Sequence, residues 1–344
     1  MPGGRGAVYH SFMNDSTPES PSPTSPADAS EPAAWRIALA RVGCGILGAV
    51  LLVASWAKSL DPGSFADLIR VEGLDFLLPA AAVAFFALFL EWFLGAALLF
   101  GVRHRWIFWP TAALVAFFVF LTGRKYWRHL QGIEPEEGTS CGCFGNLVER
   151  TPGEAFWQDF LLMVPALLLI GLAVDKAARL PMKRLIAATL IGIGMTVFAW
   201  KAPDLPLDNL ATRLKPGIDP FTLCAGSEDD GSRVCLGAIL PELESGRHLV
   251  VMADVTADDF VAAIPVLNEF AWLEGAPPLW VLSSADEEQL FTLRFTHGPT
   301  FEIRETPAPL MKPLYRTMPR SFLVVDGKVE ETFSGFPPWD DFRP

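Results

Sequence analysis

The chain has 344 residues, of which 51% are hydrophobic, and it carries a formal net charge of −12 at pH 7. This apolar content, together with a positive mean hydropathy, is not that of an ordinary soluble protein. The acidic balance and the lack of a basic face argue against nucleic acid as a partner. Five cysteines are too few for a scaffold built on disulfides.

The N-terminal tail, residues 1–34, is rich in Pro, Ser, Ala, Asp and Glu and has no apolar periodicity, so we predict it to be disordered. Five apolar runs follow, each long enough to cross about 30 Å of hydrocarbon as a helix. We expect a loop after the first run, with Lys58, Asp61-Pro62, Phe65 and Asp67 in it. The sequence therefore predicts a polytopic α-helical membrane protein with spans at about 37–57, 76–100, 106–123, 156–174 and 185–200.

Basic residues in the short links between the runs predict the orientation. Arg103 and Arg105 lie between the second and third runs, and a basic cluster at 176–184 separates the fourth from the fifth. The positive-inside rule puts these links and the N-terminus in the cytoplasm. With five spans, the loop near residue 141 and the C-terminal part then lie on the extracytoplasmic side of the cell inner membrane. The run at 185–200 is the shortest, and a four-span alternative would leave the C-terminal part in the cytoplasm.

From residue 204 onward the chain has the composition of a soluble domain. Alternating strand and helix patterns, followed by two strands joined at Asp326-Gly327, predict a small α/β sheet domain. We expect Thr256 or Asp258 to cap the helix after the first buried strand. The predicted elements are strands 221–224 and 233–236 about a turn at 228–231, strands 248–254 and 279–282, helices 256–273 and 285–295, and a hairpin of 321–325 with 329–333.

The polar loop between the third and fourth runs contains Cys141-Gly142-Cys143-Phe144-Gly145. A disulfide between cysteines one residue apart closes a small, strained ring, which suits an exchangeable bond better than a structural one. The alternatives are a pair of metal ligands or a loop that only packs on the membrane surface. A zinc site would need a second ligand pair, which this loop lacks, and we predict no metal. Cys141 and Cys143 are therefore the candidate redox pair.

The remaining cysteines have other predicted roles. Cys224 and Cys235 lie on facing predicted strands, so we expect a structural disulfide between them. The alternative is that this pair exchanges electrons with Cys141 and Cys143. Cys44 lies in the inner half of the first span, too deep to reach the outer pairs, and is predicted to be a small core residue.

Glu91 is an ionisable residue inside the second run. We place it below the bilayer midplane, where a carboxylate is neutral, paired or facing a polar cavity, and Arg41 is the expected partner. An interhelical ion pair is one interpretation of Glu91, and an intramembrane proton or quinone site is the other. We expect Lys58 to reach the outer interface beside Asp61.

Several short motifs of the membrane part are shared with one family. They are Arg41, Ala57-Lys58, Asp61-Pro62, Phe65, Leu78-Pro79, Glu91 through Gly95 and Cys141-Gly142-Cys143-Phe144-Gly145. Over about residues 36–174 the chain thus resembles the MauE (methylamine utilisation) branch of the DoxX-like membrane proteins. One departure is Gln158-Asp159, where an Arg-Asn pair is expected.

The MauE resemblance implies a four-helix membrane domain that acts in the maturation of disulfide-containing exported proteins, methylamine dehydrogenase being the name-giving case. The wider DoxX resemblance implies a quinone-linked oxidoreductase subunit that uses Glu91. Quinone is therefore the one candidate cofactor.

Residues 217–336 resemble a thioredoxin-like domain, with Met318-Pro319 where that fold places its cis-proline. The usual CxxC motif is missing, because residues 255–259 after the first buried strand contain no cysteine. Since a thiolate is the nucleophile in dithiol exchange, the domain cannot perform this reaction from the usual position. Pro319 is then a candidate partner-binding residue.

These observations divide the chain into a tail (1–34), a MauE/DoxX-like four-helix membrane domain (35–175), a fifth helix with its linker (176–203) and a thioredoxin-like domain (204–344). The leading hypothesis is a membrane thiol–disulfide oxidoreductase component or maturation factor. Its partners would be an exported client protein or a thioredoxin-like redox protein. The alternatives are a non-enzymatic assembly or binding protein and the quinone-linked subunit.

Overall fold

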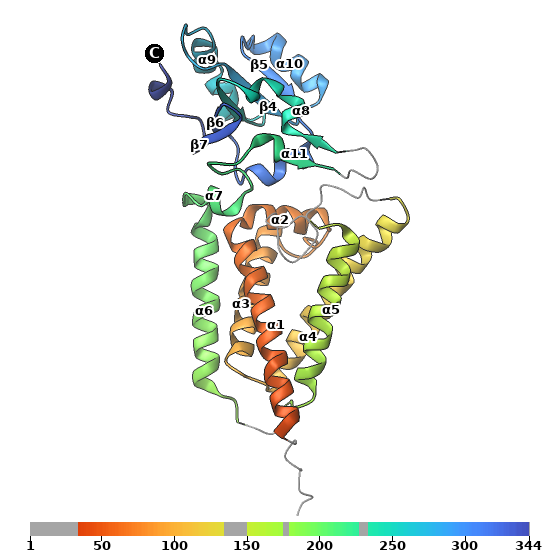
Figure 1. The fold of residues 1–344 in the computed structure, drawn as a ribbon. Helices are drawn as coiled ribbons and strands as arrows, with labels where there is room; N and C mark the ends of the chain where they lie inside the picture. Colours follow the sequence, from red (N-terminus) through yellow and green to blue (C-terminus); the bar gives the residue numbers. More distant parts are fainter. Residues whose placement is uncertain (1–33, 134–149, 175–178, 227–232, 344) are drawn as a thin grey trace, which may run out of the picture.

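The computed structural model describes residues 34–133, 150–174, 179–226 and 233–343. Within them a bundle of long helices carries an α/β domain at one end (Figure 1). Cys141 and Cys143, and the predicted turn at 228–231, lie outside the described residues.

In the part of the chain that the structure describes, five helices are long and apolar enough to cross a membrane, as the apolar runs predicted. Helix α1 is central and packs against α3 and α5, while α6 packs against α3. The helices approach closely at glycines: a Cβ atom on Gly43 would lie 2.5 Å from the carbonyl oxygen of Ala166, and one on Gly48 would lie 2.9 Å from that of Gly95. Small residues at these crossings let the backbones meet. The five helices are α1 (Ala34–Leu60), α3 (Ala80–Leu99), α4 (Arg105–Leu130), α5 (Pro152–Gly171) and α6 (Met182–Lys201).

The predicted loop after the first span is instead mostly a helix, α2 (Pro62–Val71). Asp61 is its N-cap and accepts a hydrogen bond from the backbone N–H of Ser64 at 3.0 Å, and Pro62 occupies the first turn. Proline is compatible with that position because it lacks only an N–H that would be unsatisfied there. Helix α2 lies across the end of the bundle that faces the α/β domain (Figure 1).

The C-terminal sheet has five strands in the order β5-β4-β3-β6-β7. Strand β3 pairs in parallel with β4 and antiparallel with β6, and the peptide bond before Pro319 is cis. This arrangement is the predicted thioredoxin-like α/β fold. The strands are β3 (Arg247–Met252), β4 (Leu279–Ser283), β5 (Glu302–Glu305), β6 (Arg320–Val325) and β7 (Lys328–Ser334), and the main helices are α9 (Asp258–Ala271) and α10 (Glu287–His297).

Three details of this domain differ from the prediction. Strand β5 was missed, because its sequence at the sheet edge is mostly charged. The N-cap of α9 is Ala257, without a side-chain bond, because Asp254 accepts the hydrogen bonds of Thr256 instead. The small hairpin is only β1 (Cys224–Ala225) with β2 (Val234–Cys235), since residues 220–222 form a 3₁₀ turn.

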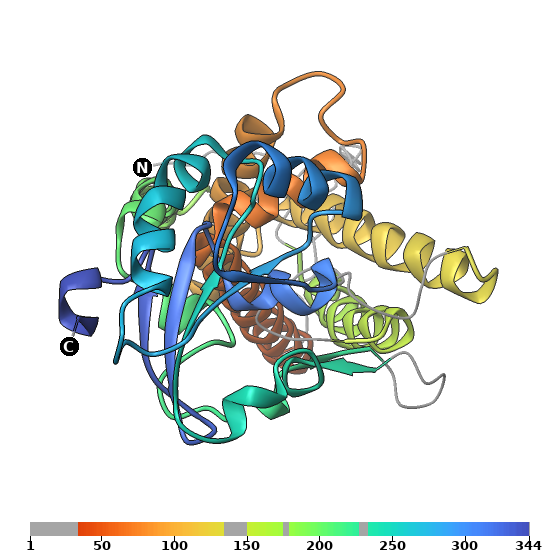
Figure 2. The ribbon, with the colours of Figure 1, turned by 90° about the horizontal axis from the view of Figure 1, so that it is seen from above.

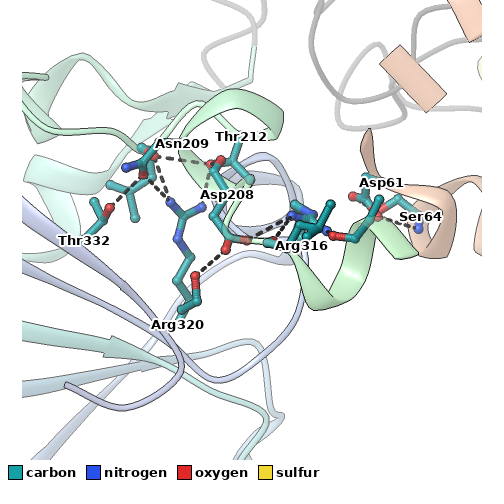
Figure 3. Close-up of polar contacts among 12 residues, drawn as sticks. Asp61, Ser64, Asp208, Asn209, Thr212, Arg316, Arg320 and Thr332 are labelled. Carbon is teal, nitrogen blue, oxygen red and sulfur yellow. Dashed lines mark hydrogen bonds and ion pairs between the residues drawn. The ribbon is translucent and has the colours of Figure 1, made fainter. Parts of the chain in front are cut away.

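A buried arginine ties the linker after α6 to the domain. Arg320 is 1% exposed. Its guanidinium donates to the carbonyl oxygens of Leu314 and Leu214 at 2.6 and 3.0 Å, to Asn209 Oδ1 at 3.1 Å and to the Thr212 hydroxyl (Figure 3). Burial lowers the pKa of Arg320 to about 10, so it stays charged at neutral pH.

A second arginine binds the end of the same helix. Arg316 donates to the carbonyl oxygens of Ala202 and Leu205, just after α6. Figure 3 shows the side chains of both arginines, which belong to the C-terminal domain, reaching this linker, which contains η2 (Ala202–Asp204) and α7 (Asp208–Ala211). The two contacts fix the direction in which the domain leaves the bundle.

Candidate functional site

A buried ion pair joins α1 to α3. Lys58 Nζ lies 2.6 Å from Glu91 Oε1, and the two side chains are 2% and 0% exposed. The Ser55 hydroxyl donates to Glu91 Oε2 at 2.9 Å. A neighbouring bond from Trp92 Nε1 to the Ser59 hydroxyl, at 3.1 Å, adds a second polar link between the same two helices. Both oxygens of the Glu91 carboxylate are therefore satisfied inside the bundle.

This pair corrects three predictions. Arg41 is not the partner of Glu91, because it lies about 26 Å of helix before Lys58. Lys58 does not reach the interface beside Asp61, because it faces the bundle interior on the same side of α1 as Ser55. Glu91 is level with the last two turns of α1 and so lies toward the domain end of the bundle, not below its middle.

The ion pair lines a cavity of about 250 Å³ between α1, α2, α3 and α4. Lys58 Nζ lies 5.0 Å from the ring centroid of Phe65 and 4.9 Å from that of Phe118, so two aromatic rings flank the ammonium group. Most of the lining is apolar. The lining residues are Lys58, Phe65, Leu68, Ile69, Glu72, Leu74, Val83, Ala87, Glu91, Leu114, Phe117, Phe118, Leu121, Thr122 and Lys125.

A second ion pair also lines this cavity. Glu72, at the C-terminal end of α2, lies 2.9 Å from Lys125 Nζ and also pairs with Arg124. Both cations belong to α4, five or six residues before that helix ends at Leu130. The pair therefore attaches α2 to the helix that leads into the loop of Cys141 and Cys143.

Helix α2 also contacts the thioredoxin-like domain. Lys312 Nζ lies 3.5 Å from Asp67 Oδ2. Burial raises the pKa of Tyr315, and the carboxylates of Asp67, Asp61 and Asp254 raise it further. Tyr315 thus lies among acidic groups from both α2 and the end of β3. The cis-proline, Pro319, is four residues further along, so the edge of the domain that carries it is turned toward the bundle.

None of the three described cysteines offers a free thiol for disulfide exchange at the domain end of the bundle. Cys44 is buried in the helical core, as expected. Cys224 and Cys235 form the predicted disulfide. Figures 1 and 2 show the β1–β2 hairpin that contains it on the side of the domain nearest the outer end of α5.

One charged residue at that flank was missed by the sequence analysis. Arg150 Nη1 lies 3.1 Å from Asp159 Oδ1, and both side chains are buried. The Gln158-Asp159 dipeptide that departs from the expected Arg-Asn pair therefore supplies a carboxylate for this ion pair. The pair holds the C-terminal flank of the Cys141 loop against α5. No sequence signal links the two residues.

The geometry defines a multi-pass membrane protein whose helical part carries a thioredoxin-like domain. Residues 36–173 match the family model of methylamine utilisation protein MauE, and this part of the chain is a MauE domain. Among solved structures, the chain is similar to a candidate thiol:disulfide interchange protein DsbE from Chlorobium tepidum, with 16% identity and a TM-score of 0.29 over 37% of this chain and 90% of that one. A search of curated proteins found no match.

Proposed function

We propose that the protein is a thiol–disulfide redox or maturation factor for exported proteins, with Cys141 and Cys143 as its redox pair. The observation that carries the proposal is the state of the other cysteines. Cys44 is buried in the helical core, and Cys224 is bonded to Cys235. Of the five cysteines, Cys141 and Cys143 are therefore the two that remain as candidates for thiol exchange at the domain end of the bundle.

The same end of the bundle holds the loop flanks and the thioredoxin-like domain (Figure 1). We propose that this end faces the extracytoplasmic side of the inner membrane, because Arg103, Arg105 and Arg184 lie at the opposite end. Disulfides form and persist in that oxidising compartment. The domain has no cysteine where β3 meets α9, so its proposed role is to bind the client or a redox partner near Pro319.

The proposed reaction is exchange of one disulfide for another. A client thiolate attacks the Cys141–Cys143 disulfide and forms a mixed disulfide, which releases one loop cysteine as a thiolate. A second client thiolate then attacks the client sulfur of that bond. The client gains a disulfide and loses two electrons, while Cys141 and Cys143 gain them as a dithiol.

A redox titration of the purified full chain tests this proposal. The chain is equilibrated in glutathione buffers, alkylated, and analysed by mass spectrometry of the peptide with Cys141 and Cys143. We expect one two-electron transition in the range of known exchange proteins, about −120 to −270 mV. A pair that stays reduced, or stays oxidised, across all buffers would contradict an exchanging pair and favour the non-enzymatic binding protein.

The Cys224–Cys235 disulfide is proposed to be structural. Changing both residues to serine removes a cross-link over a sequence separation of 11 residues, which costs about 3 kcal/mol in the chain-entropy account. We expect the domain to unfold at lower denaturant concentration while the titration of Cys141 and Cys143 keeps its midpoint. A shifted or lost midpoint would instead indicate that the two pairs exchange electrons.

A further inference from the structure

We propose that the cavity between α1, α2, α3 and α4 holds an acyl chain of one anionic phospholipid, whose phosphate pairs with Arg124. This lipid site goes beyond the proposed function and does not depend on it. A cavity of about 250 Å³ is larger than the ~150 Å³ apolar cavity that binds benzene in an engineered protein. Because most of the lining is apolar, the occupant that fits it is mostly hydrocarbon.

The cavity is partly open, and its opening lies at the depth of the acyl chains. Helix α2 contributes Phe65, Leu68 and Ile69 to the lining and lies across the domain end of the bundle, so it covers the cavity on that side (Figure 1). Phe117 also lines the cavity and is 40% exposed. This residue lies near the middle of α4, one of the candidate membrane spans. A chain that enters beside Phe117 therefore comes from the hydrocarbon of the bilayer, not from water.

The charges at the domain end of the cavity leave one cation in excess. Among the described residues, Glu72 is the single carboxylate that pairs with both Arg124 and Lys125. The pair of Lys58 with Glu91 is balanced, so the surplus positive charge stays beside Glu72. Arg124 is 37% exposed, and within the described ranges its Nε atom has no hydrogen-bond partner. An anion at the membrane surface can therefore reach Arg124 and neutralise this charge.

The length of the cavity fits the acyl chain of one leaflet. Its lining residues on α4 extend from Leu114 to Lys125, which is about 17 Å of helix at 1.5 Å per residue. Half of the bilayer hydrocarbon is about 15 Å thick. Arg124 is next to Lys125, at the end of this path that faces the domain. A lipid with its phosphate at Arg124 therefore has a chain long enough to follow the lining of the cavity.

The surplus cation favours a headgroup with a net negative charge. A zwitterionic phospholipid has the same acyl chains and phosphate, but it adds a cation of its own and brings no net charge to Arg124. Phosphatidylglycerol has the phosphate without that cation. One arginine beside an anionic lipid headgroup is worth about fivefold in affinity. Charge complementarity thus favours phosphatidylglycerol over phosphatidylcholine at this site.

Native mass spectrometry of the full chain in detergent tests the lipid site. The protein is delipidated and mixed with equal amounts of phosphatidylglycerol and phosphatidylcholine that have the same acyl chains, and the mass of the retained lipid is measured as the collision energy is raised. We expect one phosphatidylglycerol to remain bound per chain, with a preference of about fivefold over phosphatidylcholine. Equal retention of the two lipids would overturn the inference.

Matched variants locate the headgroup and the chain. Arg124→Gln should lower the retention of phosphatidylglycerol about fivefold, whereas Lys201→Gln, which changes an exposed cation at the domain end of α6, should not. Ala87 lines the cavity, and Ala82, on another side of α3, is exposed. Ala87→Phe should abolish the retained lipid, and Ala82→Phe should keep it.

Each pair of variants has an outcome that contradicts the proposal. Equal loss of lipid in Arg124→Gln and Lys201→Gln would mean that any cation at the membrane surface holds the headgroup. Unchanged retention in Ala87→Phe would place the chain outside the cavity.

Thermal unfolding in detergent gives a second measurement that does not depend on Ala87→Phe folding. Added phosphatidylglycerol should raise the unfolding midpoint of the parent chain and of Lys201→Gln, because a ligand that binds the folded state stabilises it. The midpoints of Arg124→Gln and of the milder variant Ala87→Leu should rise less. An equal rise in all four proteins would contradict a lipid site in this cavity.

Discussion

Lys58→Met is expected to destabilise the helical bundle by about 3 to 5 kcal/mol, the usual cost of breaking one side of a buried ion pair. The reason is that Glu91, which is fully buried, would keep its charge without a cationic partner or would have to take up a proton. Unfolding in detergent, followed by intrinsic tryptophan fluorescence, measures the loss. Trp92, next to Glu91 in α3, is one of the eleven tryptophans that contribute to this signal.

The double variant Lys58→Met/Glu91→Leu tests whether the lost ion pair causes the instability of Lys58→Met. Because it removes both charges, it should recover most of the lost stability. Lys183→Met, on an exposed position of α6, is the matched control and should change stability by less than about 0.5 kcal/mol. If the single and double variants were equally unstable, the ion pair would not be the cause, and packing at Lys58 would be.

Arg320→Met is expected to release the linker from the thioredoxin-like domain. The substitution leaves the Leu214 and Leu314 carbonyl oxygens and the Asn209 side chain without their shared donor. Hydrogen bonds to a charged group contribute about 1.5 to 3 kcal/mol each, so a total loss above about 3 kcal/mol is expected. Limited proteolysis should then cut the linker between α6 and β1, and chemical denaturation should show the lower stability.

Arg343→Met is the control for this change. Arg343 forms ion pairs with Glu269 and Asp340 at the surface, where such pairs contribute about 0 to 1 kcal/mol. Its substitution should leave the linker resistant to protease. Equal proteolysis in the two variants would mean that Arg320 does not anchor the linker.

The sequence was sufficient to predict the five long helices and the thioredoxin-like domain. Long apolar runs reveal membrane-spanning helices, and the strand β3 with its following helix, together with the hairpin at Asp326-Gly327, reveals the α/β sheet. Helix α2 was missed, although Asp61 as N-cap and Pro62 in the first turn are both signals of a helix start. The helix has only ten residues and mixes apolar with polar side chains, so it does not stand out in the sequence as an apolar run.

The partners within the candidate site were not predictable in the same way. Lys58 and Glu91 belong to different helices, and their contact depends on the relative height and rotation of α1 and α3. Hydropathy places a helix in the membrane but does not set either quantity. The contacts of Glu72 with Lys125 and of Arg150 with Asp159 were not predictable for the same reason, because they depend on where α2 and the loop flanks lie. Only the identity of Glu91 as an ionisable intramembrane residue was visible in advance.

The measurement that tests the central claim most directly is the thiol state of Cys141 and Cys143 in living cells. Intact cells are treated with an alkylating reagent, and membranes are analysed by mass spectrometry under non-reducing conditions. The proposed function predicts a mixture of reduced and oxidised pairs that shifts when the medium is made more reducing or more oxidising. Two permanently reduced thiols, or one disulfide that never responds, would contradict it.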